Sequence, residues 1–188
     1  MPEAFYDKYD YTQYWKGRDY EDRAEKLALS KLLKLVRSRE SIIDIGGGFG
    51  RHAILYAPGF ENCVIAEPSE KLLKEAQERL SNFTNIDYVR AFGQSLPFEN
   101  NKFDVALLIR VIHHIQKPEE VLNEVYRVLK PGGYFIIEVA NKIHFLARLR
   151  AYLRGNFRFS SDLTPIDMRS KESKDRGCLL YTSDAADE

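Results

Sequence analysis

The chain has 188 residues, of which 44% are hydrophobic and 30% charged, and its formal net charge is zero. This composition is typical of a soluble globular protein that is long enough for one domain with a sizeable core. It excludes a membrane-spanning protein, because no apolar run reaches about 18 residues. Two cysteines are too few for a disulfide framework or a metal site. The acidic, aromatic N-terminus is not typical of a targeting peptide, so we expect a cytoplasmic location.

The first predicted elements are an aromatic segment and a helix. Two interpretations of the aromatic segment Phe5–Tyr20 stay open, namely a lid over an active site or rings that pack this segment onto the domain. The segment Asp19–Arg39 then has apolar residues at three- and four-residue spacing, which predicts a helix that covers one face of a sheet. Those residues are Ala24, Leu27, Ala28, Leu32, Leu35 and Val36.

The central stretch is Ser41–Ala53, with the sequence SIIDIGGGFGRHA. Its β-branched residues Ile42, Ile43 and Ile45 predict a buried parallel strand. A G-x-G-x-G turn follows, and Arg51–Ala57 is expected to begin a helix. A strand, a glycine turn and a helix N-terminus together predict a site for a nucleotide-type cofactor. The dinucleotide fingerprint G-x-G-x-x-G/A fits less well, because Arg51 occupies its last position.

Two carboxylates belong to this predicted site. Asp44 lies inside the first strand, where a buried carboxylate needs a hydrogen-bond donor, so we expect a ligand or a turn amide nearby. Glu67 follows a second predicted strand, Asn62–Ala66, and lies 21 residues after Gly46. An acid at about that distance reaches the ribose hydroxyls of a bound nucleotide. Ser69 then is a suitable N-cap for a helix that extends to about Leu80.

Three further strands are predicted in the rest of the chain, at Ile86–Arg90, Phe103–Ile109 and Tyr134–Val139. A helix begins at Pro118 and ends at Lys130, because Pro131-Gly132-Gly133 stops it and turns the chain. A last helix, Lys142–Arg158, carries only basic charges, and we favour a solvated face over an anion-binding stripe. Strands that alternate with helices predict an α/β fold with a parallel sheet.

Four segments resemble the class I S-adenosylmethionine-dependent methyltransferases. They are DIGGGFGRHA, VIAEPSE, GQSLPFENNKFDVAL and RVIHHIQKPEEVLNEVYRVLKPGGYFIIEV, and the resemblance extends from Ser41 to about Asn141. It is closest to the small-molecule branch that includes ubiquinone and menaquinone C-methyltransferases. The resemblance implies a Rossmann-like sheet with strand order 3-2-1-4-5, the cofactor S-adenosylmethionine, and in-line transfer of its methyl group to a small-molecule acceptor. It implies no nucleic-acid partner, and no metal site is expected.

The resemblance also implies roles for individual residues. The methionine part of the cofactor would lie against Asp44, Gly46, Gly48 and Gly50, the ribose against Glu67, and the adenine against Pro68, Phe92 and Gln94. The family commonly has an aspartate where this chain has Phe92, so stacking on the adenine and burial in the core remain alternatives for this ring. Arg110, at the tip of the fourth strand, would meet an anionic acceptor or the cofactor carboxylate, or would pair with a surface acid.

His114 is the candidate general base. The alternative is that His114 is a loop residue held by backbone hydrogen bonds and has no part in catalysis. His52, on the first turn after the glycines, is expected to be structural. Two other functions stay open, an NAD(P)-dependent oxidoreductase and a truncated fragment that binds cofactor without catalysis. The oxidoreductase is disfavoured by Arg51 at the last position of the dinucleotide fingerprint and by the LPF and KPGG segments.

The predicted organisation has three parts, an aromatic cap and helix (1–40), a cofactor-binding domain (41–158) and an irregular tail (159–188). The family's sixth and seventh strands are not found after Asn141, so we expect a truncated chain. The last residues, Cys178–Glu188, resemble a translated sequencing adapter and are expected to be artefactual. Without them the chain would have 28 basic and 25 acidic residues. The acceptor and the oligomeric state do not follow from the sequence.

Overall fold

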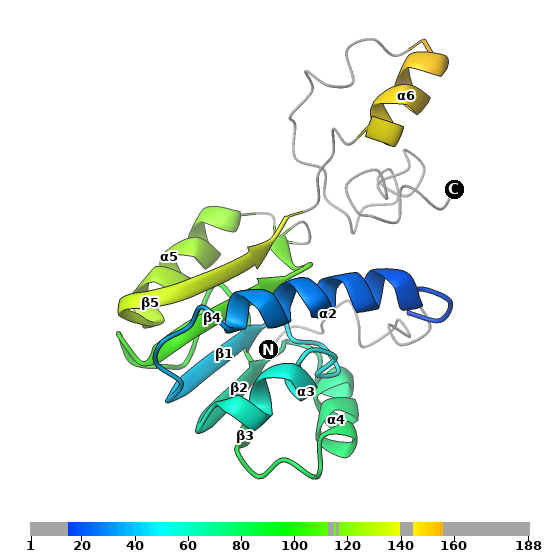
Figure 1. Cartoon of the computed structure of the whole chain (residues 1–188). Helices are drawn as coiled ribbons and strands as arrows, with labels where there is room; N and C mark the ends of the chain where they lie inside the picture. Colours follow the sequence, from blue (N-terminus) through cyan, green and yellow to red (C-terminus); the bar gives the residue numbers. More distant parts are fainter. Residues whose placement is uncertain (1–14, 113–114, 116, 140–144, 156–188) are drawn as a thin grey trace. The chain divides into compact units, whose positions relative to one another are not determined.

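Five strands form one parallel sheet. A computed structural model of the chain describes residues 15–112, 115, 117–139 and 145–155. The strands are β1 (Ser41–Ile45), β2 (Asn62–Ala66), β3 (Ile86–Val89), β4 (Phe103–Ile109) and β5 (Leu129–Glu138), in the order β3-β2-β1-β4-β5 (Figure 1). This confirms the predicted fold class and strand order. The order reverses between β1 and β4, and in such sheets ligands bind beyond the carboxyl ends of the strands at that point.

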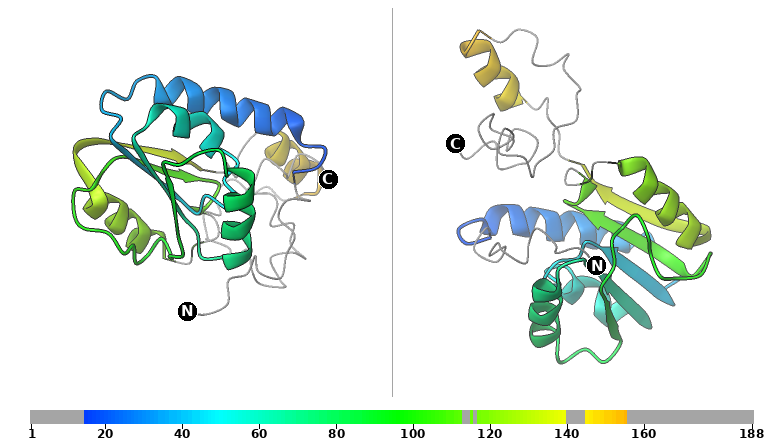
Figure 2. Two further views of the ribbon diagram at one scale, coloured as in Figure 1. Left: turned by 90° about the horizontal axis from the view of Figure 1, so that it is seen from below. Right: turned by 180° about the vertical axis from the view of Figure 1, so that it is seen from behind.

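Helices cover both faces of the sheet (Figure 2). On one face lie α2 (Asp19–Leu33), α3 (Ala53–Tyr56) and α4 (Glu70–Arg79), whose apolar side chains share one buried core with Ile42, Ile65 and Leu107 of the strands. On the other face lies α5 (Pro118–Val128), which buries Val121, Val125 and Val128. Because strand side chains alternate between faces, Asp44 lies on the same face as Ile42, beneath α3.

Two predicted helices are shorter in the structure. The first ends at Leu33 rather than Arg39, because the Leu33 carbonyl accepts bonds from Val36 N and from the Arg39 guanidinium at 2.8 Å. The predicted helix at Arg51–Ala57 has only four residues, Ala53–Tyr56, and continues as the 3-10 turn Ala57–Gly59. Pro58 explains this end, since proline has no amide hydrogen for a helical bond.

The last strand begins earlier than predicted. Helix α5 ends at Val128, and β5 starts at Leu129, so Pro131-Gly132-Gly133 belongs to the strand and does not form a turn. Gly133 permits this path, because a Cβ there would lie only 3.0 Å from the carbonyl oxygen of Asp104 and 2.9 Å from that of Lys130. The helix and the strand therefore meet without a loop.

The described residues fall into two compact units. The first contains the sheet with its helices, in residues 15–109 and 117–137, and the second contains residues 110–112, 115, 138–139 and 145–155. The second unit holds α6 (Phe145–Leu153), which lies within the predicted helix Lys142–Arg158, of which residues 142–144 and 156–158 lie outside the described residues. The segments 1–14 and 156–188 lie outside the described residues, and with them most of the aromatic segment and the predicted tail. No helix within the described part is sufficiently long and apolar to span a bilayer.

A buried carboxylate joins the amino ends of β1 and β4. Asp104 is 6% exposed, and its Oδ2 accepts hydrogen bonds from the Ser41 amide at 2.9 Å and the Ser41 hydroxyl at 3.0 Å. Its Oδ1 accepts a bond from Lys130 Nζ at 3.1 Å. Burial raises the pKa of Asp104, but the bonds from Ser38, Lys130 and Ser41 outweigh it and leave the pKa below its ordinary value. The ionised carboxylate therefore stabilises the fold.

We expect Asp104→Asn to lower the free energy of unfolding by about 1–3 kcal/mol at neutral pH, because asparagine offers one acceptor oxygen to these donors. The folded pKa lies below the unfolded one, so the ionised group stabilises the fold above the unfolded pKa. This contribution is lost as the pH falls through the folded pKa, and the difference between wild type and variant should then shrink. Urea unfolding at several pH values measures it, with Asp87→Asn on the exposed side of β3 as control. A difference that stays constant down to about pH 3 would contradict the assignment.

Candidate cofactor site

The glycine loop lies at the carboxyl end of β1. Gly46, Gly48 and Gly50 have φ values of +71°, +55° and +71°, which residues with a Cβ rarely adopt. The Gly46 amide donates to the Ala66 carbonyl at 2.7 Å, so β1 and β2 remain paired up to the loop. The loop therefore turns sharply at the edge of the sheet where ligands of this fold bind.

Gly47 lies directly over the carboxylate of Asp44. A Cβ at Gly47 would be 3.0 Å from Asp44 Cγ and 3.1 Å from Ile65 Cγ2, so even alanine would require these side chains to move. The sequence analysis treated Gly47 as an extra glycine inside the motif. The signal for its role was its position three residues after Asp44, but only the folded loop brings it onto the carboxylate.

Asp44 is 2% exposed and has a hydrogen-bond donor on α3. The Tyr56 hydroxyl donates to its Oδ2 at 3.2 Å, so a side chain is the donor here. The sequence predicted a ligand or a turn amide nearby, and the ligand stays a prediction. Burial raises the pKa of Asp44, while nearby His52, the Tyr56 bond and Arg51 offset part of this rise. Burial and the adjacent carboxylate also raise the pKa of Tyr56, which keeps this hydroxyl protonated as a donor.

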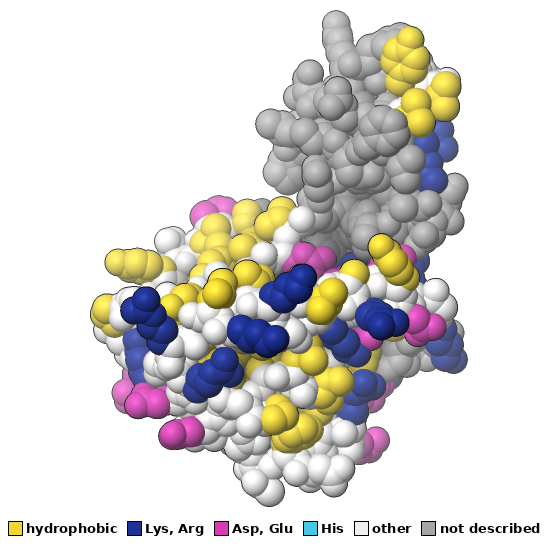
Figure 3. All heavy atoms as spheres, in the orientation of Figure 1, with side chains coloured by type: hydrophobic (Ala, Val, Ile, Leu, Met, Phe, Trp, Pro, Cys, Tyr) yellow, Lys and Arg dark blue, Asp and Glu magenta, His cyan; other side chains and the backbone are white. Residues whose placement is uncertain are grey.

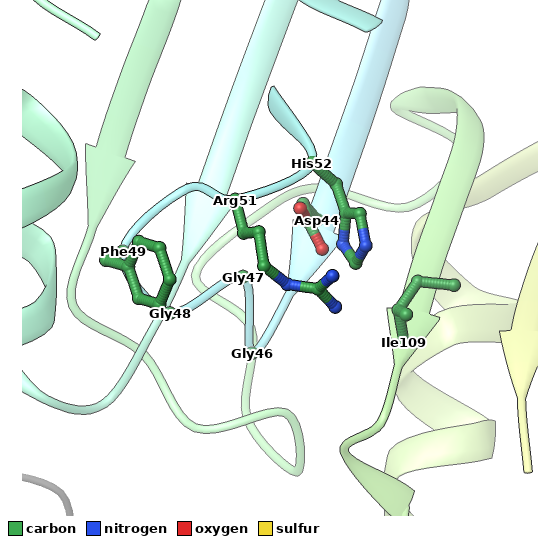
Figure 4. A pocket seen from close by; sticks show the side chains of 8 residues that line it. All are labelled: Asp44, Gly46, Gly47, Gly48, Phe49, Arg51, His52 and Ile109. Carbon is green, nitrogen blue, oxygen red and sulfur yellow. The ribbon is translucent and has the colours of Figure 1, made fainter. Parts of the chain in front are cut away.

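The first cavity of the site lies between the glycine loop and β4 (Figure 4). Its lining includes the predicted residues Asp44, Gly46 and Gly48. It also includes residues that sequence reasoning did not assign to the site, namely Gly47, Phe49, Arg51, His52 and Ile109. His52 was expected to be structural, yet its ring lines this cavity while only 6% exposed.

Helix α2 holds the end of the glycine loop through Arg51. The guanidinium of Arg51 binds Asp22 at 2.6 Å and also Glu25, and it lies 3.5 Å from the centre of the Trp15 ring. The Glu25 carboxylate lies 3.6 Å from His52 Nε2. Arg51 is only 7% exposed, so this charge is buried together with its partners. The contact connects the first described residues of the chain to the cavity.

Glu67 connects the glycine loop with the start of α4. Its carboxylate is buried, and Oε2 accepts from the Gly48 amide at 3.1 Å while Oε1 accepts from the Ser69 amide at 3.0 Å. The hydroxyl of Ser69 accepts from the Leu72 amide at 3.2 Å, which confirms the predicted N-cap. These bonds hold Glu67 at the tip of β2, the position that the sequence predicted.

The second cavity lies beyond the end of β3 and has a volume of about 630 Å³, within the usual range of small-molecule pockets. It is lined by Arg90, Ala91, Phe92, Gln94, Ser95, Pro97 and Glu120. Phe92 is partly exposed and lines this cavity, which favours a contact with a ligand over a place in the core. The structure thus places Phe92 and Gln94 in the wall of one cavity.

Helix α5 holds one wall of the second cavity in place. Arg127 donates to the carbonyls of Leu96 at 3.0 Å and of Phe98 at 2.6 Å, and Glu124 accepts from the Leu96 amide at 2.8 Å. Glu124 and Arg127 are in turn paired at 2.7 Å. Two side chains of α5 therefore bind the backbone of the predicted LPF turn on either side of its proline. The proline itself lines the cavity.

Other predicted residues lie elsewhere. Gly50, Glu67 and Pro68 line neither cavity, and the Pro68 carbonyl accepts from Arg90 Nε at 3.1 Å. Arg110 is 9% exposed with a φ of +58° and belongs to the second unit. His114 lies outside the described residues.

In the part of the chain that the structure describes, no group of three His, Cys, Asp or Glu side chains is arranged to hold a metal ion.

Comparison with known families identifies the family of this chain. Residues 43–137, half of the chain, match the model of a methyltransferase domain family. The chain belongs to this family. The matched segment contains the glycine loop, Glu67 and every residue that lines the two cavities. Trp15 and the acids of α2 that hold Arg51 precede this segment. S-adenosylmethionine is the methyl donor that this class of enzymes uses, and no match supports the oxidoreductase alternative.

Individual relatives with names are similar to part of the chain. It is 29% identical over 121 residues to a ubiquinone/menaquinone biosynthesis C-methyltransferase UbiE from Roseobacter denitrificans, covering 62% of this chain and 48% of that protein. It is 32% identical over 108 residues to the protein of the same name from Escherichia fergusonii, covering 54% and 43%. The chain thus spans about half the length of these relatives.

A solved methyltransferase structure has the same fold. A SAM-dependent methyltransferase from Thermotoga maritima superimposes with a TM-score of 0.58 at 25% sequence identity, covering 81% of this chain and 69% of that one. The shared architecture is the parallel sheet with its flanking helices. Fold and sequence comparisons therefore agree.

Proposed function

We propose that the chain binds S-adenosylmethionine at the carboxyl edge of its sheet and transfers the methyl group to a small-molecule acceptor. The observation that carries this proposal is the geometry of Glu67. Its carboxylate is buried at the tip of β2, held by the Gly48 and Ser69 amides. A carboxylate accepts up to about four hydrogen bonds, so Glu67 can receive ribose hydroxyls in addition to these amides or in their place.

The residues on either side of Glu67 fit the other parts of this cofactor. We propose that Asp44, Gly46, Gly48 and Gly50 hold the methionine part. A Cβ at Gly47 would press on Asp44, which supports a loop that lies directly against this carboxylate and leaves its other side to a ligand. We propose that Phe92 and Gln94 hold the adenine in the second cavity, with Pro68 beside it. Phe92 would then provide a stacking face where the family commonly has a carboxylate.

The reaction requires alignment more than acid–base chemistry. When bound, S-adenosylmethionine supplies an electrophilic methyl group on its sulfonium. The chain's part is to orient the donor and to exclude water, which the buried loop, Asp44 and Glu67 support. His114 is proposed as the base for an acceptor that must lose a proton, and Arg110 as a contact for an anionic group.

The acceptor and the setting of the enzyme are also proposals. Two relatives are named as C-methyltransferases of ubiquinone and menaquinone biosynthesis, which supports a small organic acceptor methylated at carbon, oxygen or nitrogen. We propose a cytoplasmic enzyme whose cofactor domain comprises residues 41–158, with residues 1–40 as its cap. The contact of Trp15 and α2 with Arg51 supports a cap that acts on the glycine loop.

Thermal unfolding of the full chain tests the proposed cofactor. We expect S-adenosylhomocysteine, the demethylated product, to raise the midpoint, with a stabilisation of about 2.7 kcal/mol at 100 times its dissociation constant. NADH at the same concentration should leave the midpoint unchanged. A cooperative transition that S-adenosylhomocysteine does not shift would refute cofactor binding by this chain.

A further inference from the structure

One side of α2 is unusual because it combines large apolar and basic side chains. Tyr20, Leu27 and Leu35 are 82%, 58% and 66% exposed. The basic residues Arg23, Lys31, Lys34 and Arg37 are also exposed and lie among them. Tyr20, Arg23, Leu27, Lys31 and Lys34 are spaced by three and four residues, which places them on one side of the helix, and Leu35 and Arg37 follow directly after its end. We call these seven residues the outer face of α2.

The outer face has a strong positive charge. Between Arg23 and Arg39 the only acidic residue is Glu25, and it points to the other side, where it binds Arg51. Asp22 also points inward and is shared by Arg51 and Lys26. The four basic residues of the outer face make no ion pair with any residue that the structure describes. Figure 3 shows Lys and Arg side chains interspersed with hydrophobic ones over this helix.

We propose that the outer face of α2 binds the surface of a membrane that contains anionic lipids. Basic side chains are attracted to lipid phosphates, and exposed leucine and aromatic side chains between them can enter the boundary of the acyl chains. The long stems of Lys and Arg permit both at once, because they keep the charge at the headgroups while lying along apolar surface.

The composition of the face favours lipid over two other partners. Nucleic acid would be bound by the charges alone, and Leu27 and Leu35 would have no role on its phosphate backbone. A second copy of this chain would present the same positive charges and would be repelled, since the face contains no acid to pair with them. Only an anionic surface with an apolar layer beneath it matches both kinds of side chain.

The inner side of the same helix would be unaffected by such binding. Leu29 and Leu33 are buried in the core, and Asp22 and Glu25 hold Arg51 at the end of the glycine loop. The proposed membrane contact is therefore separate from the cavities and can be tested without any measurement of methyl transfer.

Sedimentation of the full chain with lipid vesicles tests this proposal. The vesicles contain phosphatidylcholine alone or phosphatidylcholine and phosphatidylglycerol in equal parts. We expect binding to the anionic vesicles only, weakened by salt. The charge variant Lys31→Glu/Lys34→Glu should lower the binding constant about tenfold or more, since each basic residue near an anionic surface contributes roughly a tenfold factor or slightly less. The apolar variant Leu27→Ser/Leu35→Ser should also lower it about tenfold.

Two matched controls lie on other surfaces. Lys74→Glu reverses an exposed charge on α4, and Tyr126→Ser removes an aromatic ring on α5 that is 85% exposed. Both should bind anionic vesicles like the wild type. All variants should keep the wild-type thermal midpoint within a few degrees, because the substituted side chains are exposed.

Three results would overturn the proposal. The first is no binding of the wild type to anionic vesicles. The second is a loss in the charge variant without any loss in the apolar variant, which would indicate a polyanion such as nucleic acid. The third is wild-type self-association in the absence of vesicles that the apolar variant abolishes, which would assign the face to a second copy of the chain.

Discussion

Replacing Glu67 by glutamine is expected to weaken the binding of S-adenosylhomocysteine by about 10- to 100-fold. Hydrogen bonds to a charged acceptor contribute about 1.5–3 kcal/mol, and the variant loses the charge that the ribose hydroxyls would meet. Glutamine has one acceptor oxygen, so it also cannot satisfy both the Gly48 and the Ser69 amide. Titration calorimetry measures the affinity, and urea unfolding measures the accompanying loss of stability.

A second ligand separates the two roles of Glu67. If the carboxylate contacts the ribose 2′-hydroxyl, the wild type should bind an S-adenosylhomocysteine analogue without that hydroxyl more weakly than the parent ligand. The variant Glu67→Gln should bind the analogue and the parent with similar affinity. The control Glu78→Gln changes an exposed acid on α4 and should bind both ligands like the wild type. Equal losses for the analogue in wild type and Glu67→Gln would show that Glu67 acts by holding the loop alone.

Replacing Gly50 by alanine is expected to destabilise the fold by about 2–5 kcal/mol. The added Cβ would lie 2.5 Å from Leu80 Cδ1 and 3.3 Å from Ile65 Cδ1, and Leu80 is fully buried, so it has no room to move away. Overpacking of this kind costs about 1–3 kcal/mol. The φ of +71° adds about 1–2 kcal/mol of backbone strain for a residue with a Cβ. Urea unfolding at equilibrium measures the sum.

Gly132→Ala is the matched control for the backbone contribution. Gly132 has a φ of +78°, but a Cβ there would have no atom within 4 Å, so only the strain remains. The double variant Gly50→Ala/Leu80→Ala removes the clash, and its loss of stability should be smaller than the sum of the two single losses. Additive losses, or equal losses in Gly50→Ala and Gly132→Ala, would show that contact with α4 does not decide the identity of residue 50.

The glycine loop was predictable because its signals are local. The three isoleucines of β1, the glycines and Glu67 at the tip of β2 follow one another in the chain in the pattern that a strand, a turn and a neighbouring strand require. The position of β1 and the bounds of β2 and β4 were therefore predicted correctly. The ends of α2 and α5 were not, since the Leu33 carbonyl accepts from Arg39 and the Val128 carbonyl accepts from the Lys102 amide, and both donors lie outside these helices.

The contacts that hold the site were decided by the tertiary structure alone. Arg51 pairs with acids 26 and 29 positions earlier in the chain, and a Cβ at Gly50 would meet Leu80, which follows α4. No periodicity or motif in the sequence predicts such pairs, because they depend on how α2 and α4 pack on the sheet. The sequence by itself determined the strands, the loop and the acid at the tip of β2, since these follow from backbone preference and burial of neighbouring residues. Which side chains surround that loop was left to the packing of distant segments.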